Sequence, residues 1–188
     1  MASRSLKHLS RRPVRVNDLA KALSEIHSTT DQATALIHAT LVERTLERVI
    51  LSRMTRLTRK QRLNLFDGMA PLSSFSAKIK IAHALAIIGP QATTDLDIIK
   101  DIRNVFAHSF HPLTFRRKEI ATYCRRLKTP ERSVKLGIKL DSKPWPPRDP
   151  KIRFQVSCWI FFTALSGKAV AGPRAKRSRD IFSRHVLC

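Results

Sequence analysis

The sequence predicts an all-α protein, a helical bundle that carries a flexible basic arm at its N-terminus and a basic tail at its C-terminus. Three observations support this prediction. From Asn17 to Leu127, apolar residues recur at spacings of three and four, the period of a helix that buries one side. No alternating apolar and polar run of strand length interrupts that pattern. The chain also contains only 5 glycines, and several of its prolines lie near expected helix ends.

The length of 188 residues and a hydrophobic content of 43% suit one domain with tails. We expect residues 1–16 to form the arm, residues 17–167 the helical domain, and residues 168–188 the tail. The arm is rich in serine and arginine and contains too little apolar surface to fold alone. No internal repeat suggests a second unit.

The N-terminal part of the domain predicts two helices. Asn17 or Asp18 can cap a first helix that runs to about Ser28. Thr29-Thr30-Asp31 starts the longest helix, which is expected to continue to about Met54. Its buried stripe is formed by Ala35, Ala39, Val42, Leu46, Val49 and Ile50.

The opposite face of this long helix is charged and carries Glu43, Arg44, Glu47 and Arg48. Two carboxylates at helical spacing can hold a metal ion, but such sites use a second acidic or histidine pair on a facing helix. The sequence offers no such pair nearby. We therefore predict ion pairs for both glutamates and no metal site.

The middle of the chain predicts three more helices. The first is short and basic and covers Thr58–Phe66. The second begins at Ser73–Ser74 and stops at Gly89–Pro90, and its stripe is Phe75, Ile79, Ala82 and Leu85 or Ala86. Thr94 or Asp95 can cap the third, whose stripe is Leu96, Ile99, Ile102 (or Arg103) and Phe106.

The C-terminal part predicts a helix over Phe115–Leu127, an irregular segment over Thr129–Pro150, and a last helix over Lys151–Leu165. Prolines at 144, 146 and 147 indicate an extended linker within the irregular segment. The last helix is apolar on more than one face. A second subunit would cover the surplus, so we expect a homodimer.

The charge balance predicts affinity for polyanions. Lys and Arg number 36 against 14 Asp and Glu, a formal net charge of +22. Nucleic acid is the usual polyanionic partner, and binding of this kind carries little sequence specificity. The alternative is that the basic ends bind nothing specific. The candidate contacts are Arg174, Lys176, Arg177 and Arg179 in the tail, with Lys78 and Lys80 on a solvated helix face.

One stretch resembles a known family. Pro71-Leu72-Ser73-Ser74-Phe75-Ser76-Ala77-Lys78-Ile79-Lys80, followed by Ile102-Arg103-Asn104-Val105-Phe106-Ala107-His108, is similar to the signature of the mannitol operon repressor family. The resemblance extends over about residues 30–110. It implies an all-helical protein, and the founding member is described as a transcriptional repressor without a recognisable DNA-reading motif. Val105 stands where the family pattern more usually has a charged residue.

The Arg103-Asn104-x-x-x-His108 element also resembles the motif of HEPN-type helical domains, many of which are metal-independent ribonucleases. That resemblance implies His108 as the base or acid, Arg103 as the phosphate clamp, and Asn104 as the orienting group. On one helix, Arg103 and His108 lie ~140° apart, so they converge only at a helix end or across two subunits. The structural alternative pairs Arg103 with Glu43 or Glu47.

Other chemistry is not indicated. The three cysteines, Cys124, Cys158 and Cys188, are far apart, which favours reduced thiols over a zinc site or disulfides. No Gly-rich phosphate loop, nucleophile elbow or HExxH motif is present, and no cofactor is expected. No apolar run reaches the length of a membrane span, and the first residues lack the core of a signal peptide. They are basic and free of acids, as in an organelle transit peptide, but the bacterial resemblance favours the cytoplasm.

The sequence therefore favours a cytoplasmic regulatory protein similar to the mannitol operon repressor. It would act in transcriptional regulation through protein partners, through non-specific nucleic-acid contact, or through both. The alternative is a HEPN-type metal-independent ribonuclease, a toxin or defence component. A third possibility is a basic accessory protein that acts only through a protein partner.

Overall fold

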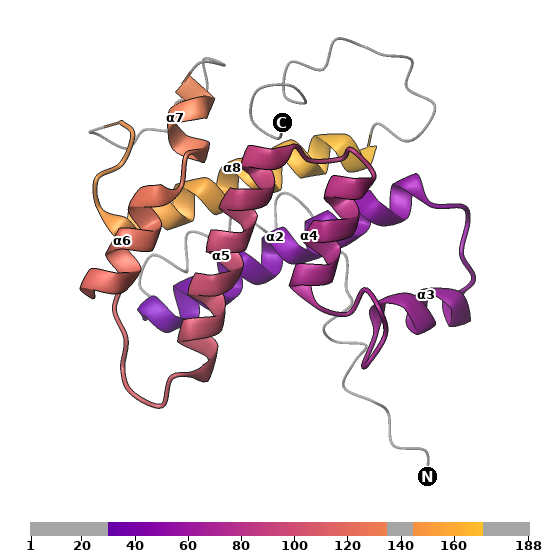
Figure 1. Ribbon diagram of the computed structural model, residues 1–188, viewed down its shortest axis with the longest axis horizontal. Helices are drawn as coiled ribbons and strands as arrows, with labels where there is room; N and C mark the ends of the chain where they lie inside the picture. The colour runs from indigo at the N-terminus through magenta and orange to yellow at the C-terminus, as the bar shows by residue number, and fades with distance from the viewer. Residues whose placement is uncertain (1–29, 135–144, 171–188) are drawn as a thin grey trace.

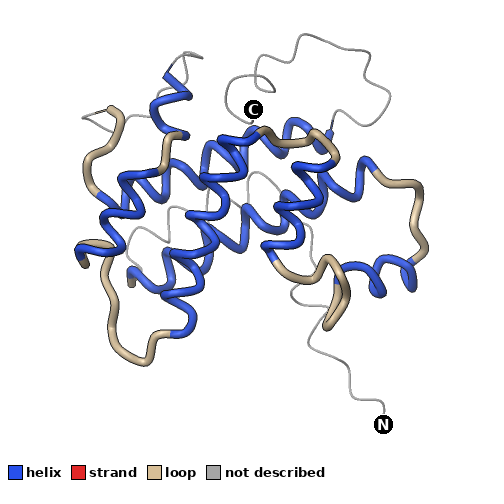
Figure 2. Tube along the Cα trace, viewed as in Figure 1, coloured by secondary structure: helices blue, strands red, loops and turns tan. Residues whose placement is uncertain are grey.

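The computed structural model describes residues 30–134 and 145–170. Within these ranges the chain is all-α, and no strand occurs, so the predicted fold class is confirmed (Figure 2). The predicted first helix over 17–28, the basic arm, and Arg174, Lys176, Arg177 and Arg179 of the tail lie outside the described residues.

The helices form a bundle around α2 (Figure 1). Helices α4 and α5 cross one side of α2, and α8 packs along it. Helices α6 and α7 pack against α8 at one end of the bundle, and α3 lies toward the other end. In chain order the bounds are α2 Asp31–Arg53, α3 Arg59–Phe66, α4 Phe75–Ala84, α5 Pro90–His108, α6 Lys118–Arg126, α7 Thr129–Val134 and α8 Pro150–Val170.

Helix α2 matches its prediction closely. The Thr30 hydroxyl accepts the Ala33 N–H at 3.2 Å and caps the helix start. Every residue of the predicted stripe, from Ala35 to Ile50, is completely buried. Because neighbouring helices cover this stripe, α2 is the central element of the core.

Helix α8 is longer than predicted and is covered within the chain. It begins at Pro150 and continues five residues beyond Leu165, to Val170. Its buried residues include Phe154, Phe161 and Leu165, and Ile160 and Val156 on other sides are buried as well. The apolar surplus of α8 therefore needs no second subunit. The homodimer stays a prediction, without support from this helix.

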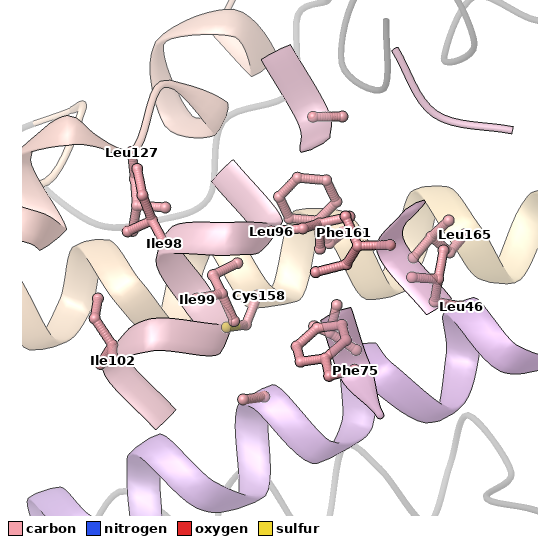
Figure 3. Close-up of a cluster of buried hydrophobic side chains, with 14 of the residues drawn as sticks. Leu46, Phe75, Leu96, Ile98, Ile99, Ile102, Leu127, Cys158, Phe161 and Leu165 are labelled. Atoms are coloured by element: carbon pink, nitrogen blue, oxygen red, sulfur yellow. The ribbon is translucent and has the colours of Figure 1, made fainter. Parts of the chain in front are cut away.

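Side chains from α2, α4, α5 and α8 meet in one core (Figure 3). Leu46 of α2 lies near Leu165 of α8, and Phe75 of α4 points into the space between α2 and α8 (Figure 3). A buried leucine, isoleucine or phenylalanine contributes roughly 1.5–3 kcal/mol by leaving water. These contacts join segments far apart in the sequence into one unit.

The turn between α4 and α5 differs from the prediction. Helix α4 ends at Ala84, so Leu85 and Ala86 do not extend its buried stripe, and Leu85 is 43% exposed. Ala86 has a φ of 51°, which reverses the chain. Ile87 and Ile88 then fill the buried positions after the turn. The prediction was wrong here because it extended the helical spacing past the last turn of α4 and so assigned Leu85 or Ala86 to the core.

Helix α5 begins five or six residues earlier than the predicted cap at Thr94 or Asp95 would place its start. Gly89 is the N-cap and Pro90 is the first residue, a position that suits a residue without an N–H. Asp95 lies inside the helix and is 1% exposed. Its carboxylate accepts the backbone N–H groups of Lys128 and Thr129 at 3.0 and 2.7 Å. It therefore caps the start of α7, and the Gly-Pro pair is the start signal of α5.

The segment after α5 contains two further corrections. Phe115, predicted as the start of a helix, lies in the loop before α6, where its ring packs between Phe106 and Phe154 at centroid distances of 4.9 and 5.2 Å. Helix α7 lies in the segment predicted as irregular. Of the predicted proline-rich linker, residues 145–147 are described, and Trp145 packs against the core.

Cys124 and Cys158 are free and buried, as the prediction of reduced thiols requires. Burial raises the pKa of the Cys124 thiol to about 12 and raises the pKa of Cys158 well above its usual value. The thiolate is the reactive form. We therefore expect a thiol reagent at pH 8 to modify both cysteines only in denaturant, as mass spectrometry of the labelled peptides would show.

The same raised pKa values predict that the free energy of unfolding decreases at high pH. Above pH 9 these thiols ionise in the unfolded chain and stay protonated in the folded one, so stability falls as pH rises from 9 toward 12. For the labelling experiment at pH 8, rapid modification of either cysteine in the native protein would contradict the burial of these thiols.

Candidate functional site

The two glutamates of α2 hold an ion-pair network that joins four helices. Glu43 accepts hydrogen bonds from Lys78 of α4 and Arg103 of α5, both at 2.9 Å. Glu47 pairs with Lys78 at 3.1 Å and with Arg62 of α3 at 3.0 Å. The predicted structural role of both glutamates is confirmed. We call these five residues the glutamate network.

Lys78 does not lie on a solvated face. It is 5% exposed, and its ammonium lies between the two glutamates. The apolar side of α4 and the charged side of α2 meet at this position, so the long lysine stem is covered by the core. The prediction that Lys78 contacts phosphate is therefore wrong, because its ammonium is buried and paired with two carboxylates. Lys80, two residues on, points the other way and is exposed.

The three motif residues do not gather at one place within the chain. Arg103 turns toward α2 and donates to Glu43. Asn104 and His108 lie on the other side of α5, where both line a groove of about 710 Å³ between α5 and α6. This separation is what the ~140° between positions five apart on a helix predicts. Helix α5 ends at His108, but its end does not bring His108 to Arg103.

The groove between α5 and α6 is mixed in character, and we call it the α5–α6 groove. Val105 and Leu113 supply apolar lining, and Asn104 and His108 supply hydrogen-bonding groups. Asp101 lies on its α5 side. The α6 side adds Arg117, Glu119, Ile120 and Tyr123. Val105, the departure from the family pattern, is thus an exposed apolar wall of this groove.

The helical spacing of Ile120, Tyr123, Cys124 and Leu127 predicts that Tyr123 lies on the buried side of its helix, and the sequence indicates no role for the basic side. In the structure Tyr123, the only tyrosine of the chain, is 40% exposed and lies at the groove. The basic residues around it are exposed along α6. A helical-wheel projection indicates this partial exposure, because Tyr123 lies about 60° from Ile120, toward the edge of the apolar stripe.

The described residues contain no candidate metal site and no candidate membrane-spanning helix. Residues 30–134 and 145–170 contain no group of three His, Cys, Asp or Glu side chains that could hold a metal ion. In the same ranges no helix combines the length and the apolar composition needed to span a membrane. The polar groups that line the α5–α6 groove are carboxylate, hydroxyl, amide, imidazole, guanidinium and phenol groups.

No protein-family model matches the sequence, and comparison with curated proteins and with solved structures gives no significant match.

Proposed function

We propose that the protein is a non-catalytic regulatory protein of the cytoplasm, similar to the mannitol operon repressor. It acts through protein partners and through electrostatic contact with nucleic acid. One observation carries the non-catalytic part of the proposal: Arg103 is a member of the glutamate network. The family-like stretch contributes Lys78 and Arg103 to the same network, so two of its charged residues have structural partners.

Metal-free RNA cleavage needs a cation beside the acid or base to stabilise the charge on phosphorus. Arg103 is that cation in the motif, but its side chain is only 25% exposed and its guanidinium bonds Glu43 at 2.9 Å. Moving it into the α5–α6 groove would break this pair and leave a largely buried carboxylate with one partner fewer. Such a break is strongly unfavourable. His108 therefore lacks its clamp within one chain.

A HEPN-type ribonuclease is the second candidate, and one observation favours it. Asn104 and His108 share the α5–α6 groove with Arg117. Arg117 is exposed and could replace Arg103 as the cation near a bound phosphate. Its guanidinium now pairs with Glu119 at 3.3 Å, a surface pair that costs little to open.

The decisive measurement is cleavage of labelled single-stranded RNA in the presence of EDTA. We expect the wild type and His108→Ala to leave the RNA equally intact, because no catalytic group is lost. His111→Ala is the matched control, since His111 is also exposed and lies three residues away in the loop after α5.

Cleavage that is lost in His108→Ala and kept in His111→Ala would overturn the proposal and establish the ribonuclease. Arg117→Ala and Arg103→Ala would then identify the cation. Circular dichroism must accompany Arg103→Ala, because this change also disrupts the glutamate network.

A further inference from the structure

Helix α6 presents a strongly basic face to solvent. Between residues 116 and 128 the exposed charged side chains are Arg116, Arg117, Lys118, Glu119, Arg125, Arg126 and Lys128. Six are cationic and one is anionic. Ile120, Ala121 and Cys124 bury the opposite side of the helix against the bundle. The charge is thus held in place by a folded helix and does not depend on the ends of the chain.

The anionic groups near this face have partners of their own. Glu119 pairs with Arg117 at 3.3 Å. Asp101, across the groove on α5, pairs with Lys100 at 3.4 Å. Among the described residues, the ion pairs therefore leave Arg125 and Arg126 without a carboxylate, so this part of α6 keeps its positive potential.

An aromatic ring adjoins this charge. The guanidinium of Arg126 lies 5.0 Å from the centre of the Tyr123 ring, a cation–π contact that holds both side chains at the groove rim. Tyr123 still exposes 40% of its surface. Beyond it the α5–α6 groove offers the Asn104 amide and the apolar wall of Val105. A stacking ring, a cation beside it and a hydrogen-bonding floor are the elements that hold an unpaired base.

We propose that the α6 face and the α5–α6 groove form a binding site for single-stranded nucleic acid. Arg125 and Arg126 contact phosphates, and one base stacks on Tyr123 with its edge toward Asn104. A duplex keeps its bases stacked inside, so it gains from the charge alone. An acidic peptide would use the same cations but not the ring. The site goes beyond the proposed function, which assigns no nucleic-acid contact to the folded domain.

The test is fluorescence anisotropy with the full chain and labelled 12-nucleotide oligo(U), oligo(dT) and a 12-base-pair duplex, in EDTA. Tyr123→Leu should weaken binding of both single strands roughly 5- to 150-fold, the range for one stacked base. It should leave duplex binding unchanged. Tyr123→Phe should bind like the wild type. A loss for oligo(U) alone would identify RNA as the ligand and a loss for oligo(dT) alone would identify DNA, and either result supports the site.

A charge-matched pair of variants separates this site from general attraction. Arg125→Gln/Arg126→Gln and Arg59→Gln/Lys60→Gln each remove two exposed cations, the second pair from α3 at the other end of the bundle (Figure 1). The α6 pair should weaken single-strand binding more than the α3 pair. It should also reduce the salt slope by about 1.4, the value for two phosphate contacts on a single strand.

Three results would overturn the site: no single-strand binding by the wild type, equal losses for the α6 and α3 pairs, or displacement of oligo(U) by poly-glutamate with Tyr123→Leu unchanged. The last would assign α6 to an acidic protein partner. Failure of this site leaves the proposed function standing when the wild type still binds the duplex, because electrostatic contact with nucleic acid is then retained. Cleavage of the oligo(U) probe, followed on a gel, would contradict the proposed function and leave the site standing.

Discussion

Replacement of Arg153 by alanine is expected to lower the free energy of unfolding by about 3–5 kcal/mol, as loss of a buried charged partner does. Arg153, in the first turn of α8, is 6% exposed. Its guanidinium donates to the carbonyl oxygens of Cys124 and Leu127 at the end of α6 and of Pro147 before α8, and to Glu131 of α7. Each orphaned buried carbonyl costs roughly 1–3 kcal/mol.

Urea denaturation followed by circular dichroism would measure the change. Glu131→Ala is the informative comparison, because Glu131 is 39% exposed and Arg153 keeps its three backbone carbonyl partners, so a smaller loss is expected. Arg125→Ala, on the exposed side of α6, should have almost no effect. If Arg153→Ala and Glu131→Ala cost the same, the bonds to the backbone carbonyls contribute nothing and the account of this residue is wrong.

Replacement of Glu43 by alanine is expected to lower the free energy of unfolding by about 2–4 kcal/mol, slightly less than for a fully buried pair. The change removes the only carboxylate bonded to Arg103 among the described ion pairs and leaves Lys78 with Glu47. Lys78→Met should cost less although Lys78 is more buried, because an apolar side chain fits that site and both glutamates keep an arginine.

A double-mutant cycle between Glu43 and Arg103 tests the pair directly. We expect a coupling energy of about 1–2 kcal/mol, within the range for residues in one network. A coupling near zero would remove the reason for regarding Arg103 as structural, and would return it to the list of candidate catalytic groups. The stability measurement therefore bears on the proposed function as well.

The helices that the sequence predicted best are those whose burial is set by one continuous stripe. The spacing of Ala35 to Ile50 predicted α2, and its expected start at Thr29-Thr30-Asp31 contains the Thr30 cap that the structure shows. Glu43 was one of the two carboxylate partners that the sequence allowed for Arg103, and the structure pairs these two residues. Both follow from local period and from the shortage of acidic partners in a basic chain.

The errors arose where tertiary contacts decide. Aspartate is a common N-cap residue, but the helix that Asp95 caps begins 34 residues later in the chain. No local sequence pattern contains that relation. Lys78 was placed on the surface because lysine is usually exposed, whereas two glutamates 31 and 35 residues earlier hold it inside. Tyr123 lies at the edge of an apolar stripe, so its exposure depends on how closely α5 approaches α6.

The central position of α2 has a consequence for synthesis of the protein. The partner that covers α2 along its length is α8, and the two are separated by almost the whole described domain. A ribosome adding 5–20 residues per second needs about 5–20 s to make the roughly one hundred residues between them. For that time the stripe from Ala35 to Ile50 lacks its main cover. The nascent chain therefore presents this apolar stripe early, and it covers the stripe fully only when α8 emerges.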